Sequence, residues 1–144
     1  MTWLIYMLCL LPAAAAHSPS VKIQNKTFFV EVAKSRAEWT QGLMNREHLA
    51  PNMGMLFLGK QSREQTFWMK NTLIPLDMIF ISDKGRIVHI EKNAAPLTET
   101  PRPSIYPARD VLEINGGLSD TFHFKEGVKD GDLVHYQNIS SENK

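Results

Sequence analysis

A small set of polar and aromatic residues could do chemistry because they interrupt otherwise apolar segments. They are Trp68, Lys70, Asn71, Asp77, Glu113 and Asn115. Burying a charge alone is costly, so a lysine or a carboxylate in such a setting usually has a partner or a ligand. These residues are therefore the candidate ligand-binding site.

The same residues allow three interpretations. In the first, Trp68 forms the apolar wall of a ligand pocket, and the amides and charges orient the ligand. In the second, Lys70, Asp77 and Glu113 form the catalytic cluster of a hydrolase or lyase, with the two carboxylates acting on an envelope polymer such as a glycan. In the third, Lys70 pairs with Asp77 or Glu113, and Asn71 and Asn115 hold turns. The sequence leaves all three open.

A hypothesis of another class is copper binding. Cleavage after Ala16 would expose His17 as the N-terminus, where an amine and an imidazole together chelate a copper ion. The chain also supplies thioethers, which are soft ligands for Cu(I), in Met44, Met53, Met55, Met69 and Met78. These methionines lie in or near expected buried strands, where methionine fills gaps in a core. We therefore expect no cofactor and keep periplasmic copper binding as a secondary alternative.

Three local catalytic motifs are missing from the chain, whereas a Ser-His arrangement stays open because its members need not lie close along the chain. It has no Gly-x-Ser-x-Gly elbow, no phosphate-binding glycine loop and no His-Glu-x-x-His helix. The net charge of +1 gives no electrostatic case for nucleic acid or for an anionic membrane. We expect a binding or accessory module of the cell envelope rather than an enzyme, with a small molecule or an envelope component as its partner.

The start of the chain predicts export. From Trp3 to Ala16 it carries no charge and ends in small residues, which is typical of a secretory signal peptide over residues 1–16. The run is shorter than the roughly 20 residues that a spanning helix needs, so no stable membrane span is expected after cleavage. The only cysteine, Cys9, lies in this segment, so the mature protein would have no disulfide. We expect a periplasmic or secreted protein.

The rest of the chain is long enough for one domain, which we place at residues 17–137, with a loose tail at residues 138–144. Ser35-Arg36-Ala37-Glu38 forms a capping box and predicts a helix over residues 36–44. Short apolar stretches between turn signals predict strands near residues 21–23, 28–32, 53–58, 67–70, 76–82, 86–92, 111–115 and 133–136. This pattern favours a mainly-β fold, a single antiparallel β-sandwich or barrel with one short helix near the N-terminus.

Several of these segments also carry a resemblance to a known family. They are Gly42 to Arg46, Met53 to Phe57, Phe67 to Thr72 with Ile74 to Asp77, Val111 to Gly117, and Gly127 to Val134. In their order and spacing they resemble the domain of unknown function 192 family, small and often exported bacterial and archaeal proteins. The resemblance implies a mainly-β, sandwich-like domain, and it implies no particular activity.

Overall fold

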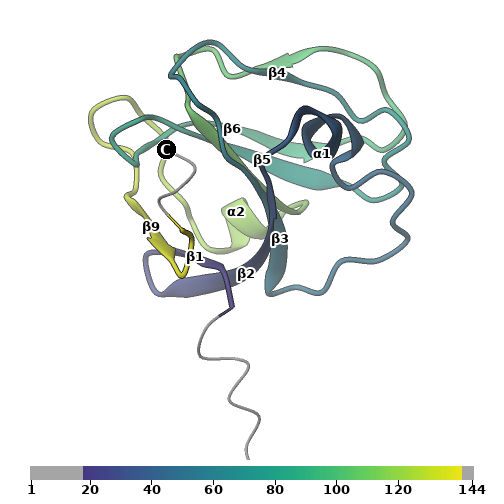
Figure 1. The fold of residues 1–144 in the computed structure, drawn as a ribbon. Helices are drawn as coiled ribbons and strands as arrows, with labels where there is room; N and C mark the ends of the chain where they lie inside the picture. Colours follow the sequence, from purple (N-terminus) through teal and green to yellow (C-terminus); the bar gives the residue numbers. More distant parts are fainter. Residues whose placement is uncertain (1–17, 141–144) are drawn as a thin grey trace, which may run out of the picture.

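Seven strands form one curled sheet in the computed structural model, which describes residues 18–140. Along the chain they are β1 (Ser20–Ile23), β2 (Lys26–Ala33), β3 (Met53–Phe57), β5 (Leu76–Ile81), β6 (Ile87–Ala94), β8 (Asp110–Asn115) and β9 (Val134–Gln137). Their order across the sheet is β6-β5-β8-β3-β2-β1-β9. Figure 1 shows how these strands curl around α2. At one end the edge strands meet, because Ile87 donates its backbone N–H to the carbonyl of Asp132 (3.0 Å). The sheet therefore curls into a half-barrel.

The strands β2 and β3 are the one parallel pair of this sheet, and the chain between them contains the helix α1 (Arg36–Gln41). Parallel neighbours need such a crossover. The expected capping box begins the helix: Ser35 Oγ accepts a hydrogen bond from the N–H of Glu38 (3.2 Å), and the Glu38 carboxylate accepts one from the N–H of Ser35 (2.8 Å). The helix ends earlier than predicted because Gly42 takes a φ of +46°.

Two further elements complete the described chain. The strands β4 (Thr66–Phe67) and β7 (Arg102–Pro103) pair as a small second sheet. A second short helix, α2 (Leu118–Thr121), follows β8. Within residues 18–140, no helix has the length and apolar character needed to cross a membrane.

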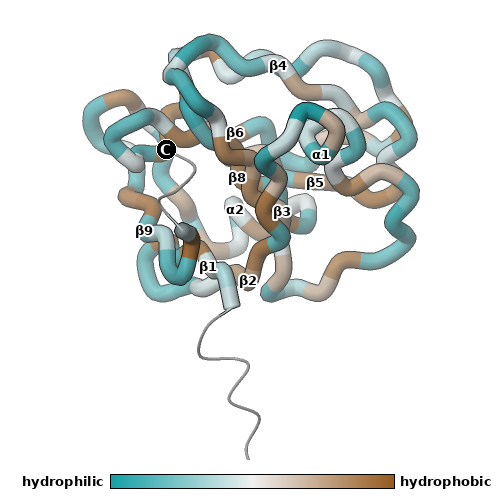
Figure 2. Tube along the Cα trace, in the orientation of Figure 1, coloured by the Kyte–Doolittle hydropathy of each residue, from teal (hydrophilic) through white to brown (hydrophobic). Residues whose placement is uncertain are grey.

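The core lies on both faces of the curled sheet. The cluster inside the curl includes Ile79, Leu112 and Phe124, and the cluster on the outer face includes Phe57 and Met78. The central strands are accordingly the apolar part of the chain (Figure 2). Every residue of β5 is buried, which is why this strand reads as an apolar run rather than as an alternating pattern.

The mainly-β expectation is confirmed, but its finer details are not. The seven-stranded sheet curls on itself, and it contains a parallel pair that a purely antiparallel sandwich would lack. Sequence patterns indicate where strands lie and do not indicate which strands pair, so the single curled sheet could not be told from two stacked sheets.

Candidate functional site

Asp77 lies on β5 and fastens two other segments to that strand. Its Oδ1 accepts hydrogen bonds from the backbone N–H groups of Asn93 (2.7 Å) and Gly117 (2.9 Å). Its Oδ2 accepts from the N–H (2.8 Å) and the hydroxyl (2.5 Å) of Ser119. The side chain is fully buried. Since four donors occupy the acceptor capacity of a carboxylate, Asp77 is a structural residue that holds the start of α2 and the end of β6.

Glu113 is also buried, but unlike Asp77 it has no hydrogen-bond donors around its carboxyl group in the described part of the chain. It lies on β8 between Met55 of β3 and Met78 of β5, and it is 4% exposed. No residue between 18 and 140 forms a hydrogen bond or an ion pair with its carboxyl group. Burial without a charged partner raises the pKa of Glu113 to about 8, so the group is mostly protonated at neutral pH.

Glu113 also borders a small cavity on the outer face of the sheet. Its volume is about 30 Å³, close to the volume of one water molecule. The other walls are mainly aromatic side chains and the turn after α1: Trp39, Thr40, Gln41, Gly42, Leu43, Met44, Phe57, Phe67, Trp68 and Thr72. We call this the Glu113 cavity. Trp68 and Glu113 are thus the two sequence-predicted candidates that the structure brings together.

The expected catalytic cluster does not form. Asp77 pairs in register with Ile114, and Met78 pairs with Glu113. Successive side chains of a strand point to opposite faces, so the two carboxyl groups lie on opposite faces of the sheet. A mechanism in which these two carboxylates flank one substrate bond is therefore wrong for this protein.

Lys70 pairs with neither acid. Its ammonium lies 5.0 Å from the centre of the Trp68 ring and 3.7 Å from the carboxylate of Glu99, and both members of this ion pair are largely exposed. The expected buried pair of Lys70 with Asp77 or Glu113 is therefore wrong. Exposed pairs of this kind contribute little to stability.

The two asparagines hold connections, as the structural interpretation expected. Asn71 takes a φ of +52° in the turn after Lys70, and its carbonyl accepts a hydrogen bond from the N–H of Asn45 (2.8 Å). Asn115 donates its side-chain amide to the carbonyl of Leu49 (2.7 Å). Neither asparagine lines the Glu113 cavity.

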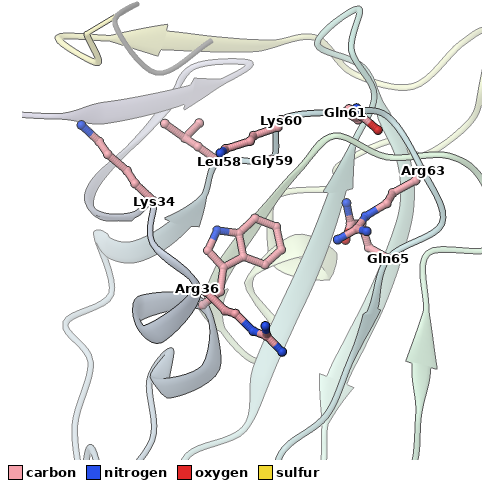
Figure 3. Close-up of a pocket in the computed structure, with 9 residues that line it drawn as sticks. Lys34, Arg36, Leu58, Gly59, Lys60, Gln61, Arg63 and Gln65 are labelled. Atoms are coloured by element: carbon pink, nitrogen blue, oxygen red, sulfur yellow. The ribbon is translucent and has the colours of Figure 1, made fainter.

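A larger cavity, of about 550 Å³, lies between α1 and the connection from β3 to β4 (Figure 3). Its lining residues are Lys34, Arg36, Trp39, Leu58, Gly59, Lys60, Gln61, Arg63 and Gln65. Four of them are cationic and none is acidic. None of these four side chains has an ion-pair partner in the described part of the chain. We call this the cationic cavity.

The connection that carries Lys60 and Arg63 is fixed to the sheet through Asp110. This fully buried carboxylate accepts hydrogen bonds from the N–H of Gly59 (3.1 Å), the guanidinium of Arg109 (2.7 Å) and the hydroxyl of Tyr136 (2.9 Å). Burial and the neighbouring Asp110 raise the pKa of Tyr136, so its phenol stays protonated and donates. A Cβ atom on Gly59 would lie 2.0 Å from the carbonyl oxygen of Arg109, so the close approach requires glycine.

A second anchor holds the other end of the connection. Arg63 and Ala108 exchange two backbone hydrogen bonds (3.1 and 2.9 Å), and Gln65 donates its side-chain amide to the carbonyl of Ala108 (3.2 Å). The connection is therefore anchored at both ends, while the exposed side chains of Lys60 and Arg63 extend from it. Because this backbone is already ordered, binding of a ligand to these side chains would cost little backbone entropy.

Sequence reasoning missed the cationic cavity entirely. Its cations come from two segments more than twenty residues apart, Lys34 with Arg36 and Lys60 with Arg63, and the nearly neutral total charge hides them. The available signal was that both pairs flank the ends of β2 and β3. Only the parallel pairing of these strands places the two ends side by side.

The copper hypothesis falls largely outside the described residues, because His17 precedes them. Of the expected thioether ligands, Met55, Met69 and Met78 are buried in the outer-face core cluster. No group of three or more His, Cys, Asp or Glu side chains within residues 18–140 is arranged to hold a metal ion.

Comparison with known proteins places this chain in a family. None of the curated proteins matches it. A crystal structure of a protein of unknown function from Novosphingobium aromaticivorans DSM 12444 is 41% identical, covers 81% of this chain and 83% of its own, and has a TM-score of 0.74. A protein from Sinorhizobium meliloti 1021 called a "putative transcription regulator" is 35% identical, with 86% and 98% covered and a TM-score of 0.74. The model of DUF192, "Uncharacterized ACR, COG1430", matches residues 19–134, and the chain therefore belongs to this family.

Proposed function

We propose that the protein is a small binding protein for organic anions and that the cationic cavity is the binding site. The observation that supports this most is the group of four cations, none of which forms a salt bridge within residues 18–140, around a cavity with no acidic lining residue. A volume of about 550 Å³ is within the range of small-molecule sites. Anions are attracted to such a concave positive surface because the local field concentrates them there.

The lining residues also indicate the kind of anion. Arg36 and Arg63 present planar guanidinium groups, which bind carboxylate or phosphate through two parallel hydrogen bonds. Trp39 and Leu58 add an apolar surface on the same cavity. The ligand is therefore an organic molecule with a carboxylate or phosphate group and an apolar part, rather than an inorganic ion alone.

The direct test is calorimetric titration with glycerol 3-phosphate, with citrate and with uncharged glycerol. We expect the two anions to bind and glycerol not to bind. The double variant Arg36→Ala with Arg63→Ala should lower the affinity for the anions by a factor of about 20 or more, because two cations at roughly 5 Å contribute about 1 kcal/mol each in an exposed site.

The matched control removes two exposed cations outside the cavity, Lys84 and Lys129. This control has the same net charge as the cavity variant, so it should keep at least half of the wild-type affinity at moderate salt. If the control loses as much affinity as the cavity variant, binding reflects the total charge and the proposed site is wrong. The ratio of the affinities for glycerol 3-phosphate and citrate shows whether the site prefers a phosphate or a carboxylate group.

We also propose that the protein acts outside the cytoplasm, as an accessory module of the cell envelope. This proposal is supported by the uncharged segment Trp3 to Ala16 and its small terminal residues. Mass spectrometry of the mature N-terminus should find His17 as the first residue. An N-terminus at Met1 in protein taken from whole cells would contradict export with cleavage, and a start after His17 would also end the copper hypothesis.

A further inference from the structure

We infer that the Glu113 cavity binds a primary ammonium group, such as the end of an alkylamine or of a lysine side chain. This inference does not depend on the anion site, because it rests on a different cavity that shares only Trp39 with the cationic cavity. Its first support is the Glu113 carboxyl itself. The residue is only 4% exposed, and its carboxyl has no hydrogen-bond or ion-pair partner in residues 18–140. A buried carboxyl that borders empty space and has no partner can accept hydrogen bonds from a ligand.

The second support is the aromatic wall. The ring centres of Trp39 and Phe57 are 5.4 Å apart, and those of Phe57 and Phe67 are 5.1 Å apart. Trp68 completes the lining at the rim. Cations are attracted to aromatic faces, and an aromatic cage with a carboxyl group is the chemistry that recognises an ammonium ion. The Trp68 ring already has the ammonium of Lys70 at 5.0 Å.

The third support is size and access. At about 30 Å³ the cavity has room for a single –NH₃⁺ group and excludes a quaternary ammonium. The exposed residues Thr40, Gln41 and Trp68 line it, so the alkyl chain of the ligand would leave toward solvent. The hydroxyls of Thr40 and Thr72 donate elsewhere, to the carbonyls of Arg36 and Lys70. Their hydroxyl oxygens can still accept hydrogen bonds, as an ammonium group with three N–H donors requires.

Binding of an ammonium changes the charge of the site. No other lining residue is titratable. On the packed elements, Arg46 pairs with Glu31, Lys70 pairs with Glu99, and Asp77 faces the opposite side of the sheet. The entering cation favours the ionised carboxyl, so Glu113 loses its proton to solvent while the ammonium keeps all of its own protons. Affinity should therefore rise with pH until Glu113 is ionised without a ligand.

The test is a titration of the full chain with methylammonium chloride, followed by the indole N–H signals of Trp39 and Trp68 in NMR spectra. Tetramethylammonium is the size control and should not bind. Below pH 8 the methylammonium affinity should fall about tenfold per pH unit, because the fraction of ionised Glu113 falls by that factor. Glu113→Gln should lower the affinity at about pH 8.5 at least tenfold, and its spectrum should show that the fold is kept.

The matched control is Glu99→Gln, which removes an exposed carboxylate from the same side of the molecule and should change the affinity less than twofold. Equal affinity of Glu113→Gln and wild type would overturn the inference. An affinity that rises as the pH falls would overturn it too, because it would show that binding does not depend on the ionised carboxyl of Glu113. No shift of either indole signal at about pH 8.5 would have the same consequence.

Discussion

Glu113 should make the stability of this protein fall as the pH rises. The pKa of its carboxyl is about 8 in the folded protein and 4.5 in the unfolded chain. Between these values the folded protein holds a proton that the unfolded chain has released. The free energy of unfolding therefore decreases from about pH 4.5 to pH 8 and levels off above pH 8. A carboxylate that is stabilised by a partner has the reverse effect, because it makes the free energy of unfolding increase with pH.

The size of the effect follows from the two pKa values. A difference of about 3.5 pKa units corresponds to ~5 kcal/mol, of which ~4 kcal/mol is lost between pH 5 and pH 9. This is a large part of the 5–15 kcal/mol that typically stabilises a domain. Glu113→Gln removes the titration and keeps the shape of the side chain. Relative to wild type, the variant should therefore gain ~4 kcal/mol of stability between pH 5 and pH 9.

The assay is guanidinium unfolding of both proteins at pH 5, 7 and 9, followed by tryptophan fluorescence. Comparing the two proteins at each pH cancels the histidines and the other acids, which both proteins share. Glu99→Gln serves as the control, since this exposed carboxylate should give a nearly constant difference. If the free-energy difference between wild type and Glu113→Gln changes by less than 1 kcal/mol over this range, Glu113 is not the buried, unpaired acid described above.

Two further predictions concern the anchors of the fold. Asp77→Ala leaves four donors without their acceptor and should lower the free energy of unfolding by about 3–5 kcal/mol in chemical denaturation, and a loss below 1 kcal/mol would contradict its structural role. Gly59→Ala forces a Cβ atom against the carbonyl of Arg109 and should cost about 1–3 kcal/mol. Calorimetry should also show severalfold weaker anion binding, and an unchanged affinity would mean that the connection does not position the cationic cavity.

The parts of the fold that could be predicted from the sequence are those with local signals. The capping box at Ser35 and Glu38 depends on residues three apart, so it was visible before the structure and is present in it. The apolar runs Leu76–Ile81 and Val111 to Asn115 predicted strands for the same reason. Polar turns between such runs also marked most of the connections.

The wrong predictions concerned contacts between segments that are far apart in the sequence. Asp77 and Glu113 look like a pair in the sequence, and they face opposite sides because of the register between β5 and β8. A shift of one residue in this register would reverse that result, and no local pattern fixes it. The cationic cavity was missed for the same reason, since Lys34 and Arg63 become neighbours only through the parallel pairing of β2 with β3.

Two of the three buried carboxyl groups of the sheet, those of Asp77 and Glu113, support a functional role for its outer face. On one face Asp77 has all of its acceptor capacity filled, which shows that this fold can satisfy a buried acid. On the other face Glu113 is left without a partner, although an apolar side chain at that position would avoid the cost of ~5 kcal/mol at high pH. Packing alone therefore does not account for Glu113. Trp39 lines both the Glu113 cavity and the cationic cavity, so an ammonium in one and an anion in the other would contact the same indole.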